Sequence, residues 1–265
     1  MNFILIDGSY FIYHRYFSLK TWWNNAKRPT ETDVPYDNER FIQKFKSTLT
    51  KKIHELAETY SESEVPIVMV AKDCPSENIW RRRLFAEYKH GRRKDEEGVG
   101  KSFATAYGGN LFMEAGVAAI LYDDELEADD CIAITTRHIT GRYPNATVDI
   151  ITSDMDYLQL VSDRVHVYNL KGQSLIDSKQ SFKNADKDLF CKIVAGDKSD
   201  NIQSVFPRCG PKTAERYYHN RELFRNELEN NENAKALYNR NRILVDLSEI
   251  PEHLVERFKT KCLLL

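Results

Sequence analysis

The chain has 265 residues, enough for one large domain or a main domain with a small appendage, and 42% of its residues are hydrophobic. Its 38 Lys and Arg residues nearly balance 40 Asp and Glu residues, so net charge alone neither indicates nor excludes a polyanionic partner. Five scattered cysteines without a C-x-x-C pair indicate neither a zinc ribbon nor a disulfide framework, and a reducing compartment is the default expectation.

The first part of the chain alternates short apolar runs with segments of helical periodicity. Residues 3–6 (FILI) form an apolar run of buried-strand length, and Gly8 and Ser9 then begin a short aromatic helix. Residues 40–58 place apolar side chains at helical spacing beneath a basic outer face, which predicts an amphipathic helix. PIVMVA at 66–71 follows as a second buried strand.

Three further strands are predicted before the pattern changes. They are VAAILY at 117–122, VDIITS at 148–153 and VHVYNL at 165–170. Strands that alternate with helices favour an α/β fold with a mostly parallel central sheet and helices on both faces. Only helices and turns are expected beyond residue 185, so we divide the chain into an α/β domain at 1–185 and a helical subdomain at 186–265.

A basic, glycine-bearing segment at 80–103 separates the second and third strands. Its Lys and Arg residues outnumber its acids, and three glycines loosen its backbone. This composition predicts a mobile excursion that faces phosphate. The basic residues are Arg81, Arg82, Arg83, Lys89, Arg92, Arg93, Lys94 and Lys101.

Acidic residues gather where the predicted strands and turns end. They are Asp7, Asp73, the trio Glu127, Asp129 and Asp130, and the pairs Asp154 with Asp156 and Asp197 with Asp200. One Asp at such a place is commonly a helix N-cap, but caps vary among Ser, Thr, Asn and Asp, whereas every cluster position here is acidic. Strand ends of a parallel sheet meet at one edge, where these carboxylates would repel one another without a cation. We therefore predict a metal site, and a simple turn residue is an equal alternative for Asp73 alone.

The ligand types favour Mg²⁺, with Mn²⁺ as a substitute, because they are hard oxygens and no His joins the clusters. Two ions about 4 Å apart would activate a water and stabilise the leaving oxygen in phosphodiester hydrolysis. Lys89 and Arg92 in EYKHGRR are the candidates for binding the scissile phosphate, and solvated surface charge is their plain alternative.

A second signal for phosphate binding lies in GPKTAERYY at 210–218. Glycine followed by proline begins a helix whose first N–H groups face an anion, and this arrangement grips a phosphate backbone without reading bases. The alternative is an ordinary Gly-Pro helix start, which the downstream arginines disfavour. The residues concerned are Gly210, Lys212, Thr213 and Arg216.

In this order the motifs resemble the flap endonuclease family of 5′ nucleases, including phage enzymes described as RNase H-type or 5′–3′ exonucleases. The matching pieces are Asp7, Asp73, E-A-D-D at 127–130, S-D-x-D at 153–156 and G-D-x-x-D-N at 196–201. The resemblance runs from residue 3 to about residue 218. The combined set is highly specific, although no single piece would be.

The resemblance implies a PIN-like sheet, an arch at about 80–115 that passes a single-stranded 5′ end, and a helix-three-turn-helix element that binds duplex DNA. Glu127, Asp129 and Asp130, with Asp7 and Asp73, would hold the catalytic ion, and Asp154, Asp156, Asp197 and Asp200 would hold or orient the second. Lys89, Arg92 and Asp130 would be catalytic. The DNA-binding residues would be Arg81, Arg82, Arg83, Arg93, Lys94, Arg208, Gly210, Lys212, Thr213 and Arg216.

The sequence departs from the family pattern at two places. Arg208 and Cys209 replace the first half of the usual Gly-hydrophobic-Gly turn, where a K⁺ ion often accompanies the duplex-binding element. The C-terminus RFKTKCLLL also lacks the clamp-binding pattern of the cellular eukaryotic members, so the chain looks more viral or phage than cellular.

The function expected from these features is structure-specific, metal-dependent 5′ nuclease activity on branched, nicked or RNA-primed DNA during replication or repair. Two alternatives stay open: a PIN-type or toprim-type nuclease acting on RNA, and a non-catalytic DNA-binding derivative of the fold. The expected partners of this monomer are DNA or an RNA–DNA hybrid, with a single-strand-binding protein or clamp. No leader and no apolar run of ~18 residues is evident, so we expect a cytoplasmic protein without a membrane span, in a host cell if phage-encoded.

Overall fold

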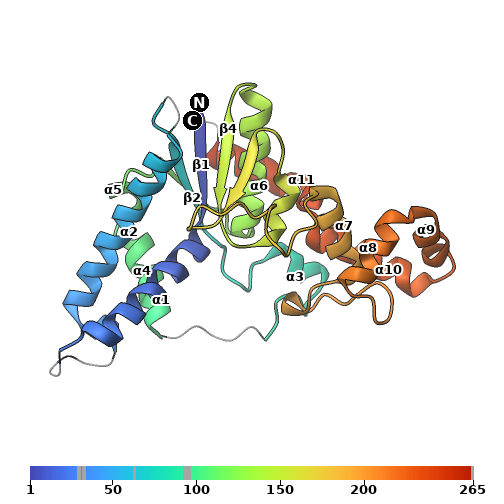
Figure 1. Ribbon diagram of the computed structural model, residues 1–265, viewed down its shortest axis with the longest axis horizontal. Helices are drawn as coiled ribbons and strands as arrows, with labels where there is room; N and C mark the ends of the chain where they lie inside the picture. The colour runs from blue at the N-terminus through green and yellow to red at the C-terminus, as the bar shows by residue number, and fades with distance from the viewer. Residues whose placement is uncertain (29–30, 32–33, 62–63, 92–96, 264–265) are drawn as a thin grey trace.

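The computed structural model describes all residues except 29–30, 32–33, 62–63, 92–96 and 264–265. Its centre is a five-stranded parallel sheet in the order β3-β2-β1-β4-β5 (Figure 1). The strands are β1 (Asn2–Asp7), β2 (Ile67–Ala71), β3 (Ala119–Leu121), β4 (Thr147–Ile151) and β5 (Val165–Tyr168). The five predicted strands and their parallel arrangement are confirmed.

Alternate side chains of β1 build two separate cores. Ile4 and Ile6 point to the face covered by α1 (Gly8–Ala26), α2 (Glu39–Thr59), α4 (Glu97–Gly108) and α5 (Leu111–Glu114). Phe3 and Leu5 point to the opposite face, against α6 (Ala128–Arg142) and α11 (Glu252–Cys262). This alternation follows from the two-residue period of a strand, and it buries both faces of the sheet. Figure 1 shows the two layers on either side of the strands.

The first helix is longer than the short aromatic helix that the sequence predicted. It has 19 residues, because Phe11, Tyr16 and Trp23 continue one buried stripe along it. The predicted amphipathic helix at 40–58 is present as α2, and it packs the same stripe from the other side.

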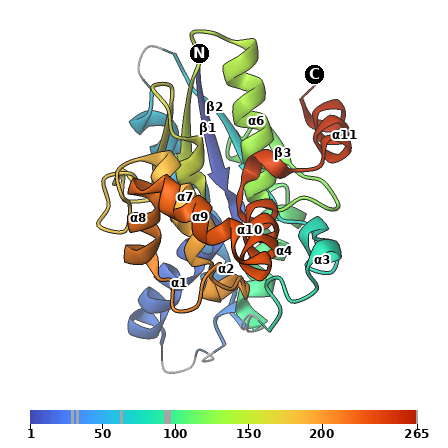
Figure 2. The ribbon, with the colours of Figure 1, turned by 90° about the vertical axis from the view of Figure 1, so that its right-hand side faces the viewer.

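The C-terminal region is helical, as expected; most of it lies to one side of the sheet in Figure 1, and in the turned view of Figure 2 it lies in front of the strands. Its elements are α7 (Ala185–Ala195), η3 (Lys198–Asp200), α8 (Pro211–His219), α9 (Arg221–Glu229), α10 (Glu232–Val245) and η4 (Leu247–Glu249), followed by α11. A separate core joins α7, α8, α9 and α10, and Phe190 of α7 and Phe224 of α9 belong to it. Leu254 and Phe258 of α11 return to the core of the sheet, so the final helix packs with the α/β part.

The segment between β2 and β3 forms α3 (Trp80–Leu84), a series of turns, α4 and α5. A small fourth core ties its first part to the C-terminal helices, because Ile79 and Tyr88 pack with Ile202 and Leu244. The predicted site residues Arg92, Arg93 and Lys94 lie outside the described residues. Within the described part of the chain, none of the helices is both long and apolar enough to cross a membrane.

Candidate metal centre and nucleic-acid interface

Acidic side chains from four separate segments meet at the carboxyl ends of β1, β2 and β4. They surround a cavity of about 310 Å³. The acids that line it are Asp7, Asp73, Glu127, Asp129 and Asp154, and the other lining residues are Ser9, Tyr10, Tyr13, Lys89, Ala128, Thr152, Ser153 and Tyr157. The fold thus brings together five of the nine predicted metal ligands, because parallel strands end at the same edge.

Asp7 lies at the end of β1 and caps α1. Its carboxylate accepts hydrogen bonds from the backbone N–H of Tyr10 at 3.0 Å and the hydroxyl of Thr152 at 3.0 Å. Burial and then the negative charge of Asp73 raise the pKa of Asp7 to about 7. A carboxyl group that resists ionisation in this way is one that a cation would stabilise in its charged form.

Asp73 links the first turn of α1 to the first turn of α6. Its carboxylate accepts hydrogen bonds from the hydroxyl of Ser9 and from the backbone N–H of Ala128, the latter at 2.8 Å. Ala128 is the first residue of α6, so Asp73 binds a free N–H at the positive end of that helix. These contacts show that Asp73 is more than an isolated turn residue, while its role as a metal ligand stays a prediction.

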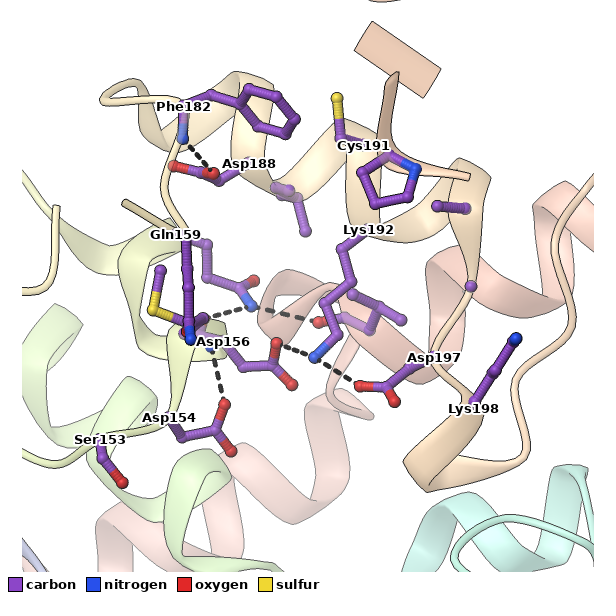
Figure 3. Close-up of a pocket in the computed structure, with 17 residues that line it drawn as sticks. Ser153, Asp154, Asp156, Gln159, Phe182, Asp188, Cys191, Lys192, Asp197 and Lys198 are labelled. Carbon is purple, nitrogen blue, oxygen red and sulfur yellow. Dashed lines mark hydrogen bonds and ion pairs between the residues drawn. The ribbon is translucent and has the colours of Figure 1, made fainter. Parts of the chain in front are cut away.

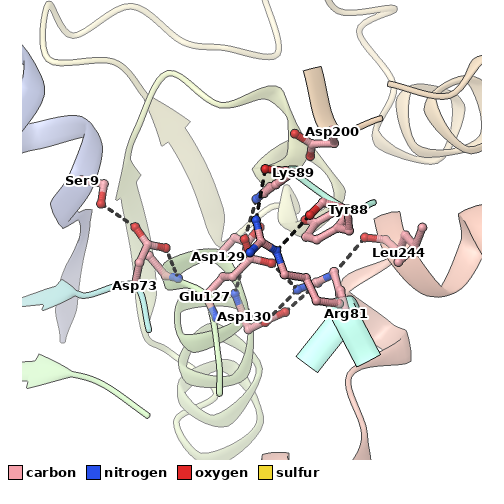
Figure 4. A network of polar contacts seen from close by, with 12 residues as sticks. Ser9, Asp73, Arg81, Tyr88, Lys89, Glu127, Asp129, Asp130, Asp200 and Leu244 are labelled. Atoms are coloured by element: carbon pink, nitrogen blue, oxygen red, sulfur yellow. Dashed lines mark hydrogen bonds and ion pairs between the residues drawn. The ribbon is translucent and has the colours of Figure 1, made fainter. Parts of the chain in front are cut away.

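The three acidic side chains at the start of α6 point in two directions. Glu127 and Asp129 line the cavity, whereas Asp130 is fully buried and turns toward α3 (Figure 4). Both Asp130 oxygens bind the guanidinium of Arg81, at 2.7 Å and 2.8 Å, and Asp130 also accepts from the indole N–H of Trp80 at 2.9 Å. An ion pair therefore competes with the predicted role of Asp130 as a metal ligand and catalytic residue.

Arg81 is buried inside the protein, with 1% of its surface exposed. Its guanidinium also donates to Glu127 at 3.0 Å and to the carbonyl oxygen of Leu244 at 2.9 Å. The prediction that Arg81 binds DNA is therefore wrong, because all of its charge is directed at internal carboxylates. A basic run in the sequence does not reveal which of its members turns inward.

Lys89, in the turns that follow α3, also lines the cavity. Its ammonium group binds Glu127 at 2.5 Å, and its backbone has a φ of +53°. Burial opposes the ionisation of Glu127, but Lys89 and Arg81 outweigh it and lower the pKa of Glu127. Burial, Asp130 and Glu127 together raise the pKa of Asp129 well above its usual value. Of the residues that the structure describes, five carboxyl groups line the cavity together with a single cationic side chain, that of Lys89.

These residues fit a divalent metal. The cavity is lined by carboxylate and hydroxyl oxygens, and neither His nor Cys is among the described residues that line it. Within the trio at the start of α6, one ligand atom of each residue lies within 4.8 Å of the others. Hard oxygen donors at this density suit a divalent cation.

The second acidic group lies beside the first, around a cavity of about 500 Å³ (Figure 3). The ammonium group of Lys192 in α7 lies between Asp156 and Asp197, binding the former and lying 3.0 Å from the latter. Burial opposes the ionisation of Asp197, but Lys192 and Ser199 outweigh it and hold its pKa at about 2. Sequence reasoning missed Lys192, since its only signal is a lysine one helical turn before the Gly-Asp turn.

Asp200 lies beside a different cation from Asp197. It lies close to Lys89, where its charge helps to raise the pKa of Lys89 even though burial opposes this (Figure 4). The two acids of G-D-K-S-D-N thus face different lysines. The four predicted ligands of the second ion therefore do not share one cation: Asp156 and Asp197 contact Lys192, whereas Asp200 lies close to Lys89.

The remaining predicted DNA-binding residues differ in exposure. Lys212 and Arg216 are exposed on α8, where Gly210 is the N-cap and Pro211 the first helical residue. Arg208 is exposed and has a φ of +58°, the left-handed region that glycine favours. A cavity of about 1030 Å³ lies beside this turn, with Arg208 and Gly210 in its wall.

Two arginines of the basic segment contact the protein itself. Arg82 donates to the carbonyl oxygens of Tyr88 at 3.0 Å and Lys89 at 3.1 Å, so it supports the loop that carries Lys89. Arg83 is largely exposed and pairs with Glu125. Thr213 is half-buried at the start of α8.

Comparison with known proteins gives one family. The model of the 5′-3′ exonuclease N-terminal resolvase-like domain matches residues 2–188. A 5′-3′ exonuclease of Halalkalibacterium halodurans is 31% identical over 219 residues, which cover 80% of this chain and 67% of that protein. A flap endonuclease Xni of Colwellia psychrerythraea is 31% identical over 134 residues, covering 49% of this chain and 44% of that protein.

Solved structures agree on the fold. The D15 protein of phage T5, co-crystallised with metal ions, superimposes with a TM-score of 0.68 at 19% identity, covering 98% of each chain. A variant of the T5 D15 flap endonuclease in a pseudo-enzyme-product complex with DNA and metal ions gives 0.67 at 19% identity, covering 98% of this chain and 97% of that one. At this identity the likeness concerns the architecture.

Proposed function

The chain belongs to the 5′-3′ exonuclease family, and on that premise we propose that it is a divalent-metal-dependent 5′ nuclease. Its substrate would be DNA with a single-stranded 5′ end or flap, or an RNA-primed strand, and its reaction would be phosphodiester hydrolysis near that end. The observation that carries this proposal is the convergence of five carboxylates from four segments on one cavity at the carboxyl edge of the sheet. A protein that only bound DNA would gain nothing from such a group beside a polyanion.

The residues that would hold the first ion are Asp7, Asp73, Glu127, Asp129 and Asp154, because these line one cavity. A divalent ion there would lower the pKa of a bound water and stabilise charge on the leaving oxygen. Mg²⁺ is the proposed ion, and Mn²⁺ would substitute for it. A second ion between Asp156 and Asp197 would require the ammonium group of Lys192 to move away.

Lys89 would bind the scissile phosphate. Its side chain already lines the cavity, with the ammonium group bound to Glu127, and it would exchange this partner for a phosphate oxygen when the carboxylate binds metal. A fixed ammonium group stabilises the charge that develops on phosphorus-bound oxygens in the transition state. Arg92 is proposed for the same task from its place in the sequence.

The duplex would lie against α8. The exposed Lys212 and Arg216, and the backbone N–H of Lys212 in the first turn of α8, supply positive charge without any base-reading pattern, which favours contact with the phosphate backbone. The left-handed backbone of Arg208 supports a turn of the usual shape there. A K⁺ ion at this turn is part of the proposal.

The test is cleavage of 5′-labelled flap, nicked and RNA–DNA hybrid substrates in Mg²⁺, with product lengths compared. The D129N variant should lose cleavage by a factor on the order of 10³ while keeping duplex binding, because it removes a charged ligand from the cavity. D163N, at an exposed residue outside the cavity, is the matched control and should cleave normally. Absence of cleavage by the wild-type protein on all three substrates, or full activity in D129N, would refute the proposal.

The same substrates separate the competing functions. Cleavage of single-stranded RNA but of none of the DNA substrates would indicate a ribonuclease. Duplex binding with no cleavage of any substrate would indicate a DNA-binding derivative of the fold.

A further inference from the structure

The turn that leads from α7 toward α8 is hydrogen-bonded to the loop that carries Lys89. The side-chain amide of Asn201 donates both of its hydrogens across this junction, to the carbonyl oxygens of Glu87 and His90, each at 2.8 Å. The backbone N–H of Lys89 donates in the opposite direction to the carbonyl oxygen of Asp200 at 3.2 Å. Three hydrogen bonds therefore join two segments that are more than 100 residues apart in sequence.

The turn itself is held firmly. Asp197 and Ile202 exchange two backbone hydrogen bonds, at 2.9 Å and 2.8 Å. Gly196 has a φ of +72°, and a side chain on it would collide with the carbonyl oxygen of Ile202. The fully buried Asn241 of α10 donates to the carbonyl oxygens of Ile193 at 3.0 Å and Gln203 at 2.7 Å. The turn is therefore fixed to both α7 and α10.

The loop around Lys89 needs this support. Lys89 has a φ of +53°, a left-handed conformation that costs a residue with a β-carbon about 1–2 kcal/mol. Arg82 binds the loop from one side, through the carbonyl oxygens of Tyr88 and Lys89. Asn201 binds it from the other side, at the carbonyl oxygens that flank these two residues. Together they hold the backbone from which the Lys89 ammonium group reaches Glu127.

We propose that Asn201 is a positioning residue for Lys89, which couples the turn at 196–203, between α7 and the duplex-binding helix α8, to the lysine at the metal cavity. The inference rests on the proposed nuclease function, and it adds a role for a residue that lines neither acidic cavity. Duplex docked on α8 and the ammonium group of Lys89 then belong to one rigid unit, so the distance from the duplex to the cleaved bond is set by protein geometry.

The chemistry of this position favours asparagine. One amide nitrogen supplies two N–H donors, which two converging carbonyl oxygens require. Asn201 also has a φ of +62°, and Asn tolerates the left-handed region better than most residues. An aspartate has the same shape but no donor, and its charge would repel the carbonyl oxygens of Glu87 and His90.

The first experiment measures single-turnover cleavage and duplex affinity of N201D, with Mg²⁺ in excess. We expect the cleavage rate to fall by a factor on the order of 10–100, as for a misplacement of about 1 Å, while the duplex Kd changes less than about twofold. N145D is the matched control, since Asn145 is exposed in the turn before β4, at the other end of the sheet, and it should cleave normally. N201G provides a second variant that keeps the left-handed backbone and removes the donors.

The second experiment repeats N201D in a K89M background. If Asn201 acts through Lys89, the second substitution should change the cleavage rate of K89M by less than about twofold, because the group that it positions is absent. An equal loss in both backgrounds, or unchanged cleavage in both N201D and N201G, would overturn the inference. Failure of the wild-type protein to cleave would instead overturn the proposed nuclease function.

Discussion

Substituting Arg81 by methionine should destabilise the metal-free protein strongly. Arg81 is buried, and its guanidinium makes four hydrogen bonds, three of them to the carboxylates of Glu127 and Asp130. Methionine has a similar volume but neither charge nor donors. It would leave Asp130, which has no exposed surface, as an uncompensated buried charge.

The expected loss is about 3–5 kcal/mol in the free energy of unfolding, the usual cost of removing one partner of a buried ion pair. That is a large part of the total of about 5–15 kcal/mol that holds a typical domain folded. R81K keeps the charge but loses the two-pronged contact and the bond to Leu244, so it should cost less, about 1.5–3 kcal/mol. The double variant R81M/D130N no longer has an unpaired carboxylate at position 130, so its free energy of unfolding should be at least about 2 kcal/mol higher than that of R81M.

The measurement is guanidinium denaturation followed by circular dichroism in EDTA, so that bound metal does not contribute. R83M is the matched control, because Arg83 is exposed and its ion pair with Glu125 should contribute about 0–1 kcal/mol. A loss below about 1 kcal/mol in R81M would refute the assignment of Arg81 as an internal counter-charge. So would strict additivity of R81M and D130N.

Three further predictions concern charge. Adding Mg²⁺ to EDTA-treated protein should raise Tm, and a Mg²⁺ concentration of 100 times Kd should stabilise the fold by about 2.7 kcal/mol. D129N should lose most of this rise, because it removes a carboxylate from the cavity. An equal rise in both proteins in differential scanning calorimetry would contradict the cavity as the metal site. K192M should destabilise the metal-free protein by about 1–3 kcal/mol, because Asp156 and Asp197 lose the cation between them. For the same reason, adding Mn²⁺ should stabilise K192M more than it stabilises the wild-type protein. Despite burial, Arg257 lowers the pKa of Asp123, so this pair contributes stability above pH ~4 that is lost as pH falls toward the folded-state pKa. R257Q should therefore be about 1–2 kcal/mol less stable at pH 7, and this deficit should shrink as pH falls below about 4; a deficit that stays constant as pH falls would count against this account.

The strands and the position of the acidic edge could be predicted because their signals are local. Apolar runs such as 3–6 and 66–71 are hydrophobic at every position, which is the pattern of a strand buried on both faces. A carboxylate directly after such a run lies at the carboxyl edge wherever the strand enters the sheet. This argument places Asp7, which follows the first run directly, and Asp73, which follows the second after one residue, and both line the same cavity.

The direction of each charged side chain was not predictable in this way. Arg81, Arg82 and Arg83 are consecutive and equally basic, yet one is buried against Asp130, one supports a loop, and one is exposed. On a helix, consecutive residues point about 100° apart, so a charge run is divided by whichever face meets the rest of the protein. Composition counts the charges without assigning a face to any of them.

Local patterns in the sequence predicted a parallel sheet, carboxylates at its carboxyl edge and a basic helix start, and the structure contains all three. Which of these charges contact one another depends on the packing of segments that are far apart in the chain. Lys192 reaches Asp156 across 36 residues, and Arg81 reaches Asp130 across 49 residues and Leu244 across 163. Ion pairs and hydrogen bonds operate over a few ångströms of space, and the distance between two residues along the chain does not fix their distance in the fold.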